Sequence, residues 1–294
     1  MKILLLGKTG QVGSELCRSL VPVGELTALG RADLNLENFN ALKKILHAKK
    51  PNVIVNAAAY TAVDRAEQSI ETAYLMNATL VQVLADYASM HQSLLIHYST
   101  DYVFDGLKNN AYVESDTCNP LNVYGQSKRA GEEAIIKSGA PFLLFRTSWV
   151  FSRTGRNFVN TILKLALERE KLKIVSDQYG APTSAKLIAD VTTLAIAANF
   201  QKKIESGIYH LTASGFTTWH QLACFVVKCA LKNQIPLKLH PVNIMPIPSE
   251  EYPVPAKRPH NSRLDTSELS RSLHLTLPDW RIDVENLLNA YDYA

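Results

Sequence analysis

The sequence lacks the features that define small disulfide-bonded, metal-binding or secreted proteins. It has only 4 cysteines in 294 residues, and no two of them form a Cys-x-x-Cys pair. A disulfide framework or a zinc site needs denser and more regular cysteines, so we expect reduced, partly buried thiols. The 8 histidines show no metal-ligand spacing either. The cysteines are Cys17, Cys118, Cys224 and Cys229.

Long apolar runs and a strong net charge are also missing. The run Ile3–Leu6 is far shorter than a secretory signal core or a membrane span. We therefore expect a cytoplasmic protein that does not contact a membrane. The net charge is only +4, from 31 Lys+Arg and 27 Asp+Glu, and the basic clusters are short, so nucleic acid is not an expected partner. A mild positive balance does suit anionic ligands such as nucleotides.

The first half of the chain alternates strand-like apolar runs with segments of helical spacing. Such alternation predicts βαβ units and an α/β fold with a doubly wound parallel Rossmann sheet. The predicted strands cover residues 2–7, 25–29, 53–56, 94–98 and 142–146. The predicted helices cover residues 12–20, 36–49 and 70–90.

The pattern changes after about residue 150. Short strands are predicted at 174–175 and 208–211 and a helix at 185–198, and we interpret the proline-rich stretch 243–259 as an ordered loop. The length favours two domains. We expect a dinucleotide-binding domain of residues 1–150 plus roughly 170–212, and a smaller α/β substrate-binding region of roughly 151–169 and 213–294.

Three glycines with the spacing Gly-x-x-Gly-x-x-Gly follow the first predicted strand and open the first predicted helix. Gly7 permits a tight turn, Gly10 lets backbone N–H groups approach a pyrophosphate, and Gly13 lets the helix pack close to the strand. The helix N-terminus adds free N–H groups and a positive dipole end. The pattern alone is weak, but this position in a strand–turn–helix unit predicts a dinucleotide site.

The turn after the second predicted strand indicates which nicotinamide cofactor binds. A carboxylate there would bind the adenosine ribose hydroxyls of NAD, whereas a cation would suit the 2′-phosphate of NADP. Arg31 precedes Asp33 in the sequence Gly-Arg-Ala-Asp, so we favour NADPH over NADH. Alternatively, Arg31 is a solvated turn residue.

Tyr124 and Lys128 are four residues apart and would share one face of a helix. A neighbouring ammonium favours the phenolate and would lower the tyrosine pKa from about 10. Tyrosine can then give a proton to a carbonyl oxygen while hydride reaches the carbon. Thr100 ends the fourth predicted strand, where doubly wound sheets bind ligands, and would hydrogen-bond the same oxygen. A surface helix pair and a threonine turn cap are the alternatives.

Several motifs along the chain together resemble one enzyme family. They resemble the extended short-chain dehydrogenase/reductases and, among these, the dTDP-4-dehydrorhamnose reductases, over essentially the whole chain. Besides the glycine loop, the motifs are Asn-Ala-Ala-Ala-Tyr-Thr-Ala-Val-Asp at 56–64, Tyr-Ser-Thr-Asp-Tyr-Val-Phe-Asp-Gly at 98–106, Asn-Pro-Leu-Asn-Val-Tyr-Gly-Gln-Ser-Lys at 119–128, and the segments 145–150, 177–183 and 258–265.

The resemblance implies that NAD(P)H reduces the 4-keto group of a dTDP-linked 6-deoxysugar, dTDP-4-dehydro-L-rhamnose, on the way to cell-surface polysaccharide. Tyr124 would be the proton donor, Lys128 would bind the nicotinamide ribose, and Thr100 would polarise the keto oxygen. Further cofactor contacts implied by the resemblance are Gly10, Gln11 and Val12 at the pyrophosphate, Asp33 and Leu34 at the adenine, and Ala57, Ala58 and Ala59 along the cofactor.

The same resemblance implies a set of substrate contacts. Thr100, Asp101 and Trp149 would touch the sugar nucleotide, where an indole offers a flat apolar face. Arg258 would bind the diphosphate, because its guanidinium matches phosphate geometry. Core packing for Trp149 and a surface ion pair for Arg258 are the alternatives.

One feature departs from the family pattern. Some members form a dimer bridged by Mg²⁺, which glutamates from three places hold. Glu15 matches the first of these, but Lys186 and Ala290 occupy the other two positions. Because a lysine opposes a hard dication, we expect no Mg²⁺ at such a site. A homodimer formed through other contacts stays open.

Two other functions remain as alternatives. The chain would be a 4-ketoreductase for another nucleotide-linked 6-deoxysugar, or a non-catalytic regulatory subunit on the same fold, since fold does not fix function. The presence of Thr100, Tyr124 and Lys128 favours an enzyme.

Overall fold

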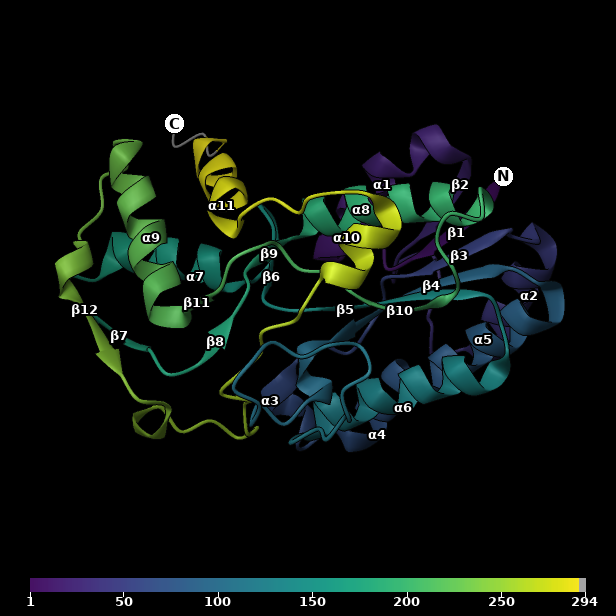
Figure 1. The fold of residues 1–294 in the computed structure, drawn as a ribbon, viewed down its shortest axis with the longest axis horizontal. Helices are drawn as coiled ribbons and strands as arrows, with labels where there is room; N and C mark the ends of the chain where they lie inside the picture. The colour runs from purple at the N-terminus through teal and green to yellow at the C-terminus, as the bar shows by residue number, and fades with distance from the viewer. Residues whose placement is uncertain (291–294) are drawn as a thin grey trace.

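A computed structural model describes residues 1–290 of the chain and shows a six-stranded, fully parallel sheet (Figure 1). The strand order is β10-β5-β4-β3-β1-β2. The predicted α/β fold with a doubly wound parallel sheet is therefore confirmed. The strands are β1 Lys2–Leu6, β2 Glu25–Leu29, β3 Val53–Asn56, β4 Leu94–Thr100, β5 Phe142–Thr147 and β10 Gly207–His210.

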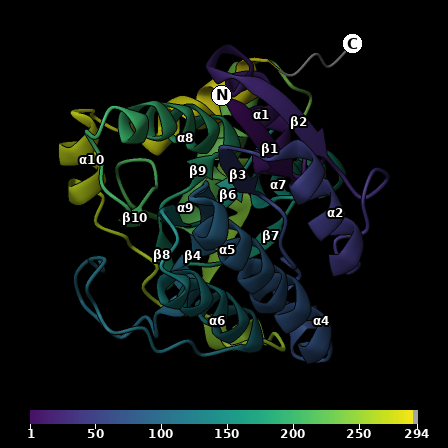
Figure 2. The same cartoon turned by 90° about the vertical axis from the view of Figure 1, so that its right-hand side faces the viewer.

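Helices cover both faces of this sheet (Figures 1 and 2). Side chains alternate between the faces along each strand. Ile3 and Leu5 pack into one apolar cluster, whereas Leu4 and Leu6 pack into the other. The first cluster includes residues of α1 Gln11–Ser19, α8 Ala185–Phe200 and α10 Ser267–Leu273, and the second includes residues of α2 Phe39–Lys49, α5 Leu80–His91 and α6 Val123–Ser138.

The helix predicted over residues 70–90 is interrupted. It consists of α4 Ile70–Tyr74, a π-helical turn Leu75–Thr79 and α5. The buried Asn77 lies in this turn, accepts a hydrogen bond from the Tyr60 backbone N–H at 2.9 Å and donates one to the Tyr60 carbonyl at 3.0 Å. Such π turns are frequent at functional sites. This one fixes the segment that follows β3.

A second group of elements lies beyond the sheet, at the left of Figure 1. Its apolar cluster is built mainly on three helices and is separate from the two clusters that flank the sheet. The helices are α7 Phe158–Glu168, α9 Trp219–Lys232 and α11 Trp280–Asn289. The short strands pair as β6 Val150–Phe151 with β9 Thr183–Ser184, β8 Tyr179–Gly180 with β11 Thr217–Thr218, and β7 Leu172–Val175 with β12 Ile244–Ile247.

The prediction that residues 243–259 form only loop is wrong at their start. β12 pairs in parallel with β7, and Pro246 lies opposite Ile174. In a two-stranded ladder each strand has a free edge, so a missing N–H group is tolerated. Short helical turns at Pro241–Asn243 and Ser249–Glu251 flank β12. The remaining short helices are Val21–Val23, α3 Val63–Ala66 and Asp101–Val103.

The chain crosses between the two groups of elements more than once. After β12 it returns to the sheet, where Leu269 and Leu277 belong to the same apolar cluster as α8. The expected division into a dinucleotide-binding domain and a substrate-binding region stays a prediction. None of the helices within residues 1–290 combines the length and the apolar character that crossing a bilayer requires.

Candidate active site

The glycine turn lies between the ends of β1 and β3, where the strand order of the sheet reverses. Gly7 has a φ of +89°, and a Cβ atom there would lie 2.8 Å from the backbone nitrogen of Ala58. A Cβ atom on Gly13 would lie 2.0 Å from the Gly7 carbonyl oxygen. Side chains are therefore excluded at both positions. Such a reversal point is where doubly wound sheets bind their ligands.

Two contacts hold the first residue of α1. The Gln11 carboxamide oxygen accepts hydrogen bonds from the Ser152 hydroxyl at 3.0 Å and from the Asn157 amide at 2.9 Å. The first helix is thus tied to the segment that leads into α7. Sequence reasoning expected Gln11 at the pyrophosphate but did not find these partners.

The residues expected at the adenosine end lie in the turn after β2. Arg31 and Asp33 are exposed, and Leu34 is buried. The Asp33 carboxylate accepts hydrogen bonds from the Lys8 ammonium at 2.7 Å and from the Gly30 backbone N–H at 2.8 Å. Both hydrogen bonds lower the pKa of Asp33, and the one from Lys8 has the larger effect. Lys8 therefore joins this site, although its position in the glycine loop did not single it out.

Thr100 is the last residue of β4, and its side chain faces the Tyr124 phenol. Burial raises the pKa of Tyr124 to about 12, while a hydrogen bond with the Thr100 side chain lowers it and the charge of Asp101 raises it. The Thr100 hydroxyl also donates to the Asp101 carboxylate at 3.0 Å. The Asn122 side chain caps α6 by accepting from the Gly125 N–H at 2.8 Å, which places Tyr124 in the first turn of the helix.

Lys128 lies one turn further along α6 and is buried. Its Nζ atom donates to the Tyr98 carbonyl at 2.5 Å and lies 3.2 Å from His97 Nε2. Burial lowers the pKa of Lys128 to about 8, against an opposing effect of Glu132. The expectation of a lowered Tyr124 pKa is wrong, because burial raises the phenol pKa more than the favourable contacts lower it. That the Lys128 ammonium stabilises the phenolate stays a prediction.

Asp101 supplies a buried carboxyl group beside Thr100. Burial raises its pKa to about 6, while hydrogen bonds from the Ser262 and Thr100 hydroxyls oppose the shift. The site therefore holds two groups, Asp101 and Lys128, whose pKa values lie near neutrality for the same reason, loss of solvent. Pairs of this kind are typical of catalytic sites.

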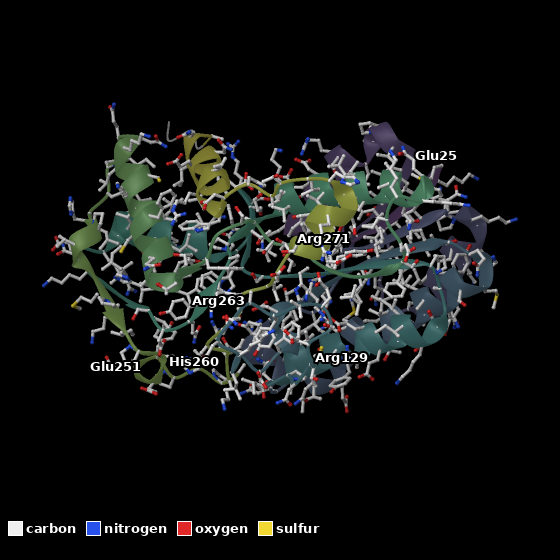
Figure 3. All side chains as sticks on the ribbon, in the orientation of Figure 1. Glu25, Arg129, Glu251, His260, Arg263 and Arg271 are labelled. Carbon is white, nitrogen blue, oxygen red and sulfur yellow. The ribbon has the colours of Figure 1, made fainter. Side chains whose placement is uncertain are left out.

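Arg258 approaches the site from the segment that returns to the sheet, on which Figure 3 labels His260 and Arg263. Its Nη2 atom lies 3.1 Å from the Asp64 carboxylate. Its Nε atom is buried and has no hydrogen-bond partner within residues 1–290. Burial raises the pKa of the Tyr102 phenol, the Asp101 charge adds to this, and the Arg258 charge opposes it. The Tyr102 ring meets the Tyr124 ring edge-on at a centroid distance of 5.8 Å.

Trp149 follows β5 and adopts a left-handed backbone conformation with φ +48°. Its ring stacks on the Trp219 ring, with a centroid distance of 3.5 Å and an interplanar angle of 11°. A Cβ atom on Gly180 would lie 2.4 Å from the Trp149 ring, so only glycine leaves room for it. The Trp219 indole N–H donates to the Gln178 carboxamide at 3.2 Å. Sequence reasoning missed Trp219, which comes from α9 and carries no local signal.

The predicted catalytic and cofactor residues therefore share one edge of the sheet. Thr100 ends β4, Ala57 follows β3, and Gly7 follows β1, and these three strands are neighbours. Parallel strands present their carboxyl ends on the same side. Tyr124 and Lys128 join this edge through the contacts with Thr100 and with the Tyr98 carbonyl.

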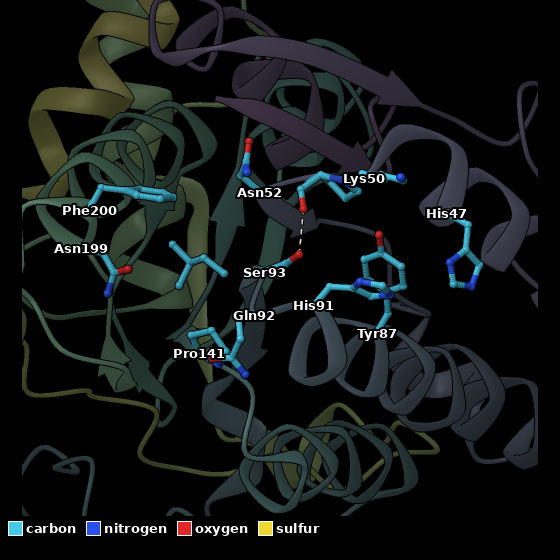
Figure 4. A pocket seen from close by; sticks show the side chains of 12 residues that line it. His47, Lys50, Asn52, Tyr87, His91, Gln92, Ser93, Pro141, Asn199 and Phe200 are labelled. Carbon is cyan, nitrogen blue, oxygen red and sulfur yellow. Dashed lines mark hydrogen bonds between the residues drawn. The ribbon is translucent and has the colours of Figure 1, made fainter.

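A pocket at the opposite, amino-terminal edge of the sheet carries less chemistry (Figure 4). It is lined in part by His47, Tyr87, His91 and Ser93. The Tyr87 and Ser93 hydroxyls already donate to backbone carbonyls, at 2.9 and 2.7 Å. The carboxyl edge therefore remains the candidate site.

Comparison with known proteins identifies the family. A family model described as the RmlD substrate binding domain matches residues 1–293. The dTDP-4-dehydrorhamnose reductase of Escherichia coli strain K12 is 47% identical over 293 residues, which cover 98% of this chain and 97% of that protein. The chain belongs to the dTDP-4-dehydrorhamnose reductase family. The resemblance drawn from the sequence motifs is thus confirmed.

Solved members of the dTDP-4-dehydrorhamnose reductase family share the fold. The protein from Clostridium acetobutylicum superimposes with a TM-score of 0.88 at 33% identity, covering 98% of this chain and 99% of that one. The protein from Bacillus anthracis, solved in complex with NADP, gives a TM-score of 0.88 at 29% identity, with 99% of each chain covered.

Proposed function

We propose that this chain uses NAD(P)H to reduce the 4-keto group of dTDP-4-dehydro-L-rhamnose to dTDP-L-rhamnose, a sugar donor for cell-surface polysaccharides such as the lipopolysaccharide O antigen. The observation that carries the proposal is the convergence of Thr100, Tyr124 and Lys128 at the carboxyl edge of the sheet, beside the glycine turn. The 47% identity with a reductase of this name over nearly the full length supports the same substrate.

Each catalytic side chain has a separate role in the proposed reduction. A nicotinamide bound at the glycine turn would supply hydride to C4 of the sugar. Tyr124 transfers its phenolic proton to the keto oxygen, so that the carbonyl π bond is replaced by one C–H and one O–H bond. Thr100 hydrogen-bonds the same oxygen, and the Lys128 ammonium stabilises the phenolate that remains. The raised pKa of Tyr124, about 12, keeps the proton on the phenol until hydride arrives.

The substrate residues come from both groups of elements. Asp101 lies beside Thr100, and the stacked indole of Trp149 follows β5. Arg258 brings its guanidinium near Tyr102, with a buried Nε that has no partner among residues 1–290. An unpaired buried donor is unfavourable unless a ligand completes it. We infer that Arg258 binds the diphosphate and that residues from roughly 151–169 and 213–294 form the sugar-nucleotide side of the site.

We favour NADPH as the cofactor. The glycine turn opens α1, whose N-terminal N–H groups suit a pyrophosphate. Arg31 is exposed in the turn after β2, while Asp33 is already paired with Lys8. A carboxylate neutralised in this way repels a 2′-phosphate less, and a free guanidinium attracts it.

Substituting Arg31→Ala tests this preference. We expect the Kd for NADPH to rise about tenfold, equivalent to about 1.4 kcal/mol, and the Kd for NADH to stay unchanged. Titrations that follow nucleotide fluorescence measure both constants, and Lys49→Ala, a charge removed at the far edge of the sheet, is the control. An unchanged ratio of the two affinities would show that Arg31 is a solvated turn residue.

The pH dependence of reduction follows from Lys128. Its pKa of about 8 means that the ammonium form, which stabilises the phenolate, is lost as the pH rises through 8. Tyr124 stays protonated over the same range. We expect kcat/KM to fall tenfold per pH unit above about pH 8. A profile that stays level to pH 9.5, measured in buffers of constant ionic strength, would contradict this role of Lys128.

Removal of divalent cations should leave the protein unchanged. Glu15 lies in an ion-pair network in which Arg18 bridges it to Asp190, at 3.6 and 3.2 Å, and Lys186 binds Asp190 at 2.6 Å. Two cations already occupy the surroundings of these carboxylates, which opposes Mg²⁺. Activity and oligomeric state, measured by light scattering, should be the same with and without a chelator. A dimer that dissociates on chelation and reforms with Mg²⁺ would refute this.

The decisive experiment combines purified protein, NADPH and the dTDP-4-keto-L-sugar. We expect a decrease in NADPH absorbance and a product whose NMR couplings identify dTDP-L-rhamnose. The opposite configuration at C4 would support a ketoreductase for another 6-deoxysugar. Nucleotide binding without turnover of any dTDP-ketosugar would support a regulatory subunit.

A further inference from the structure

A chain of buried hydrogen bonds runs from Lys128 to the backbone beside the glycine turn. Lys128 Nζ lies 3.2 Å from His97 Nε2, and His97 Nδ1 lies 3.2 Å from the Asn56 side-chain nitrogen. The Asn56 side-chain oxygen accepts from the Ala58 N–H at 3.2 Å. His97 and Asn56 are direct neighbours on β4 and β3, and both are at most 1% exposed. Bulk solvent therefore does not reach these side chains.

The Ala58 N–H group determines the direction of every hydrogen bond in this series. The Ala58 N–H can only donate, so the oxygen of the Asn56 carboxamide faces it and the NH₂ group faces His97. His97 Nδ1 must then accept. A neutral imidazole carries its single proton on the other nitrogen, so Nε2–H points at Lys128. A second proton on the ring is opposed by burial, and by the charge of Lys128 whenever that residue is protonated, so the pKa of His97 lies well below its usual range.

An N–H group facing Lys128 distinguishes between the two forms of the amine. An ammonium has three donors and no acceptor, so it would oppose Nε2–H donor to donor. A neutral amine has a lone pair for Nε2–H and still donates to the Tyr98 carbonyl, which lies 2.5 Å away. The observed geometry therefore fits the neutral amine.

The other groups around Lys128 do not change this conclusion. On α6, Glu132 favours the ammonium, but its carboxylate is bound by Arg146 of β5 and by Arg129. Tyr124, on the same helix, is uncharged because its pKa is raised. From the π-helical turn, Asn77 donates to Ser127, and neither group titrates.

We propose that His97, oriented by Asn56, is a positioning residue that presents an N–H group to Lys128 and thereby favours its neutral form. The inference rests on the proposed function in that Lys128 is taken as the catalytic lysine. Protonation of Lys128 then requires His97 to move its proton to Nδ1 and Asn56 to turn its amide, which breaks the hydrogen bond to Ala58. Protonation of Lys128 and the backbone of the cofactor site are coupled through these three side chains.

The first test uses the unaltered protein. ¹⁵N-histidine labelling distinguishes the two neutral tautomers, with His97→Gln serving only to assign the signal. We expect His97 to be the Nε2–H tautomer above pH 8, and the Ala58 amide signal to titrate together with the Lys128 side chain. A proton on Nδ1 above pH 8, or an Ala58 signal that ignores the Lys128 titration, would overturn the proposal.

The second test reverses the donor and acceptor roles along this series of hydrogen bonds. Asn56→Asp keeps an oxygen for the Ala58 N–H but replaces the amide donor by an acceptor, so His97 must carry its proton on Nδ1. We expect the titration midpoint of Lys128, followed by ¹³Cε-lysine NMR, to rise by about 1 pH unit or more. The alkaline limb of kcat/KM should move with it, and the exposed His91→Gln serves as the control.

A third variant distinguishes the effect of the new aspartate charge on the Lys128 midpoint from the effect of the His97 tautomer. In His97→Gln the side chain can turn its amide to either form of Lys128, so Asn56→Asp added to this background should move the midpoint by less than half as much. An equal movement in both backgrounds would mean that charge alone acts and would overturn the proposal. These NMR results do not depend on turnover, so an inactive wild-type protein would refute the proposed function but not this inference.

Discussion

Substituting Tyr124→Phe is expected to lower kcat about 1,000-fold, within the range of general acid catalysis, while changing the Kd for NADPH less than about threefold. The phenylalanine ring keeps the edge-on packing against Tyr102 and removes only the hydroxyl that faces Thr100. The Thr100 hydroxyl is left at the proposed position of the keto oxygen, and an aliphatic hydroxyl is a weaker acid than a phenol. Single-turnover absorbance measurements with NADPH and the dTDP-ketosugar give the rate, and nucleotide fluorescence gives the Kd.

A matched control is available on the other side of the sheet. The Tyr87 hydroxyl donates to the Leu46 carbonyl far from the glycine turn, so Tyr87→Phe should keep kcat within about twofold. If Tyr124→Phe retained a tenth or more of the wild-type rate, Asp101 would become the proton donor to examine, because its pKa of about 6 keeps part of it protonated. Loss of NADPH binding in the variant would instead indicate a structural role.

The fold was predictable because its signals are local. The apolar runs of β2 and β3 coincide with the observed strands, and Gly7 and Gly13 occupy positions where the structure leaves no space for a Cβ atom. β12 was missed because proline weighs against strands in general, whereas its effect depends on whether the N–H group it removes had a partner. That information lies in the pairing with β7 and not in the segment itself.

The site was predictable only where sequence spacing determines geometry. The four-residue interval places Tyr124 and Lys128 on one helix, but it does not reveal that burial raises the phenol pKa or that His97 holds the lysine. The His97 contact spans 31 residues of sequence and depends on how α6 lies against β4. Burial and long-range contact are properties of the packed chain, so the residues that set proton affinities could not be read from motifs.

A buried ion pair between Arg146 and Glu132 holds α6 against the sheet. Arg146 of β5 donates to Glu132 through Nε at 2.9 Å and through Nη2 at 2.8 Å, and both side chains are at most 1% exposed. Arg129, labelled in Figure 3, binds the same carboxylate from a more exposed position. Glu132 lies one helical turn after Lys128, so the ion pair also fixes the position of α6 on the sheet.

Substituting Arg146→Met should reduce the free energy of unfolding by about 3–5 kcal/mol, because it leaves the Glu132 carboxylate buried without its main partner. The exposed pair of Lys137 and Glu133, at 3.4 Å, is the matched control, and Lys137→Ala should change stability by at most about 1 kcal/mol. Urea denaturation followed by circular dichroism measures both values. Adding Glu132→Leu should restore most of the loss, since removing both charges is often neutral. A double variant as unstable as the single one would show that packing around Arg146, and not its charge, was lost.

The pH dependence of the stability of Arg146→Met is an independent test of the same ion pair. In the unaltered protein, hydrogen bonds from Arg146 hold the pKa of Glu132 below its usual value, so its contribution to stability is present above about pH 4.3 and declines as the pH falls through the folded-state pKa. Without Arg146, burial raises the Glu132 pKa above the unfolded value. The folded variant then binds the proton more tightly than the unfolded chain, so its stability falls as pH rises above about 4.3. The deficit relative to the unaltered protein should therefore widen between pH 4 and pH 7, and a deficit that is constant over this range would exclude an electrostatic origin.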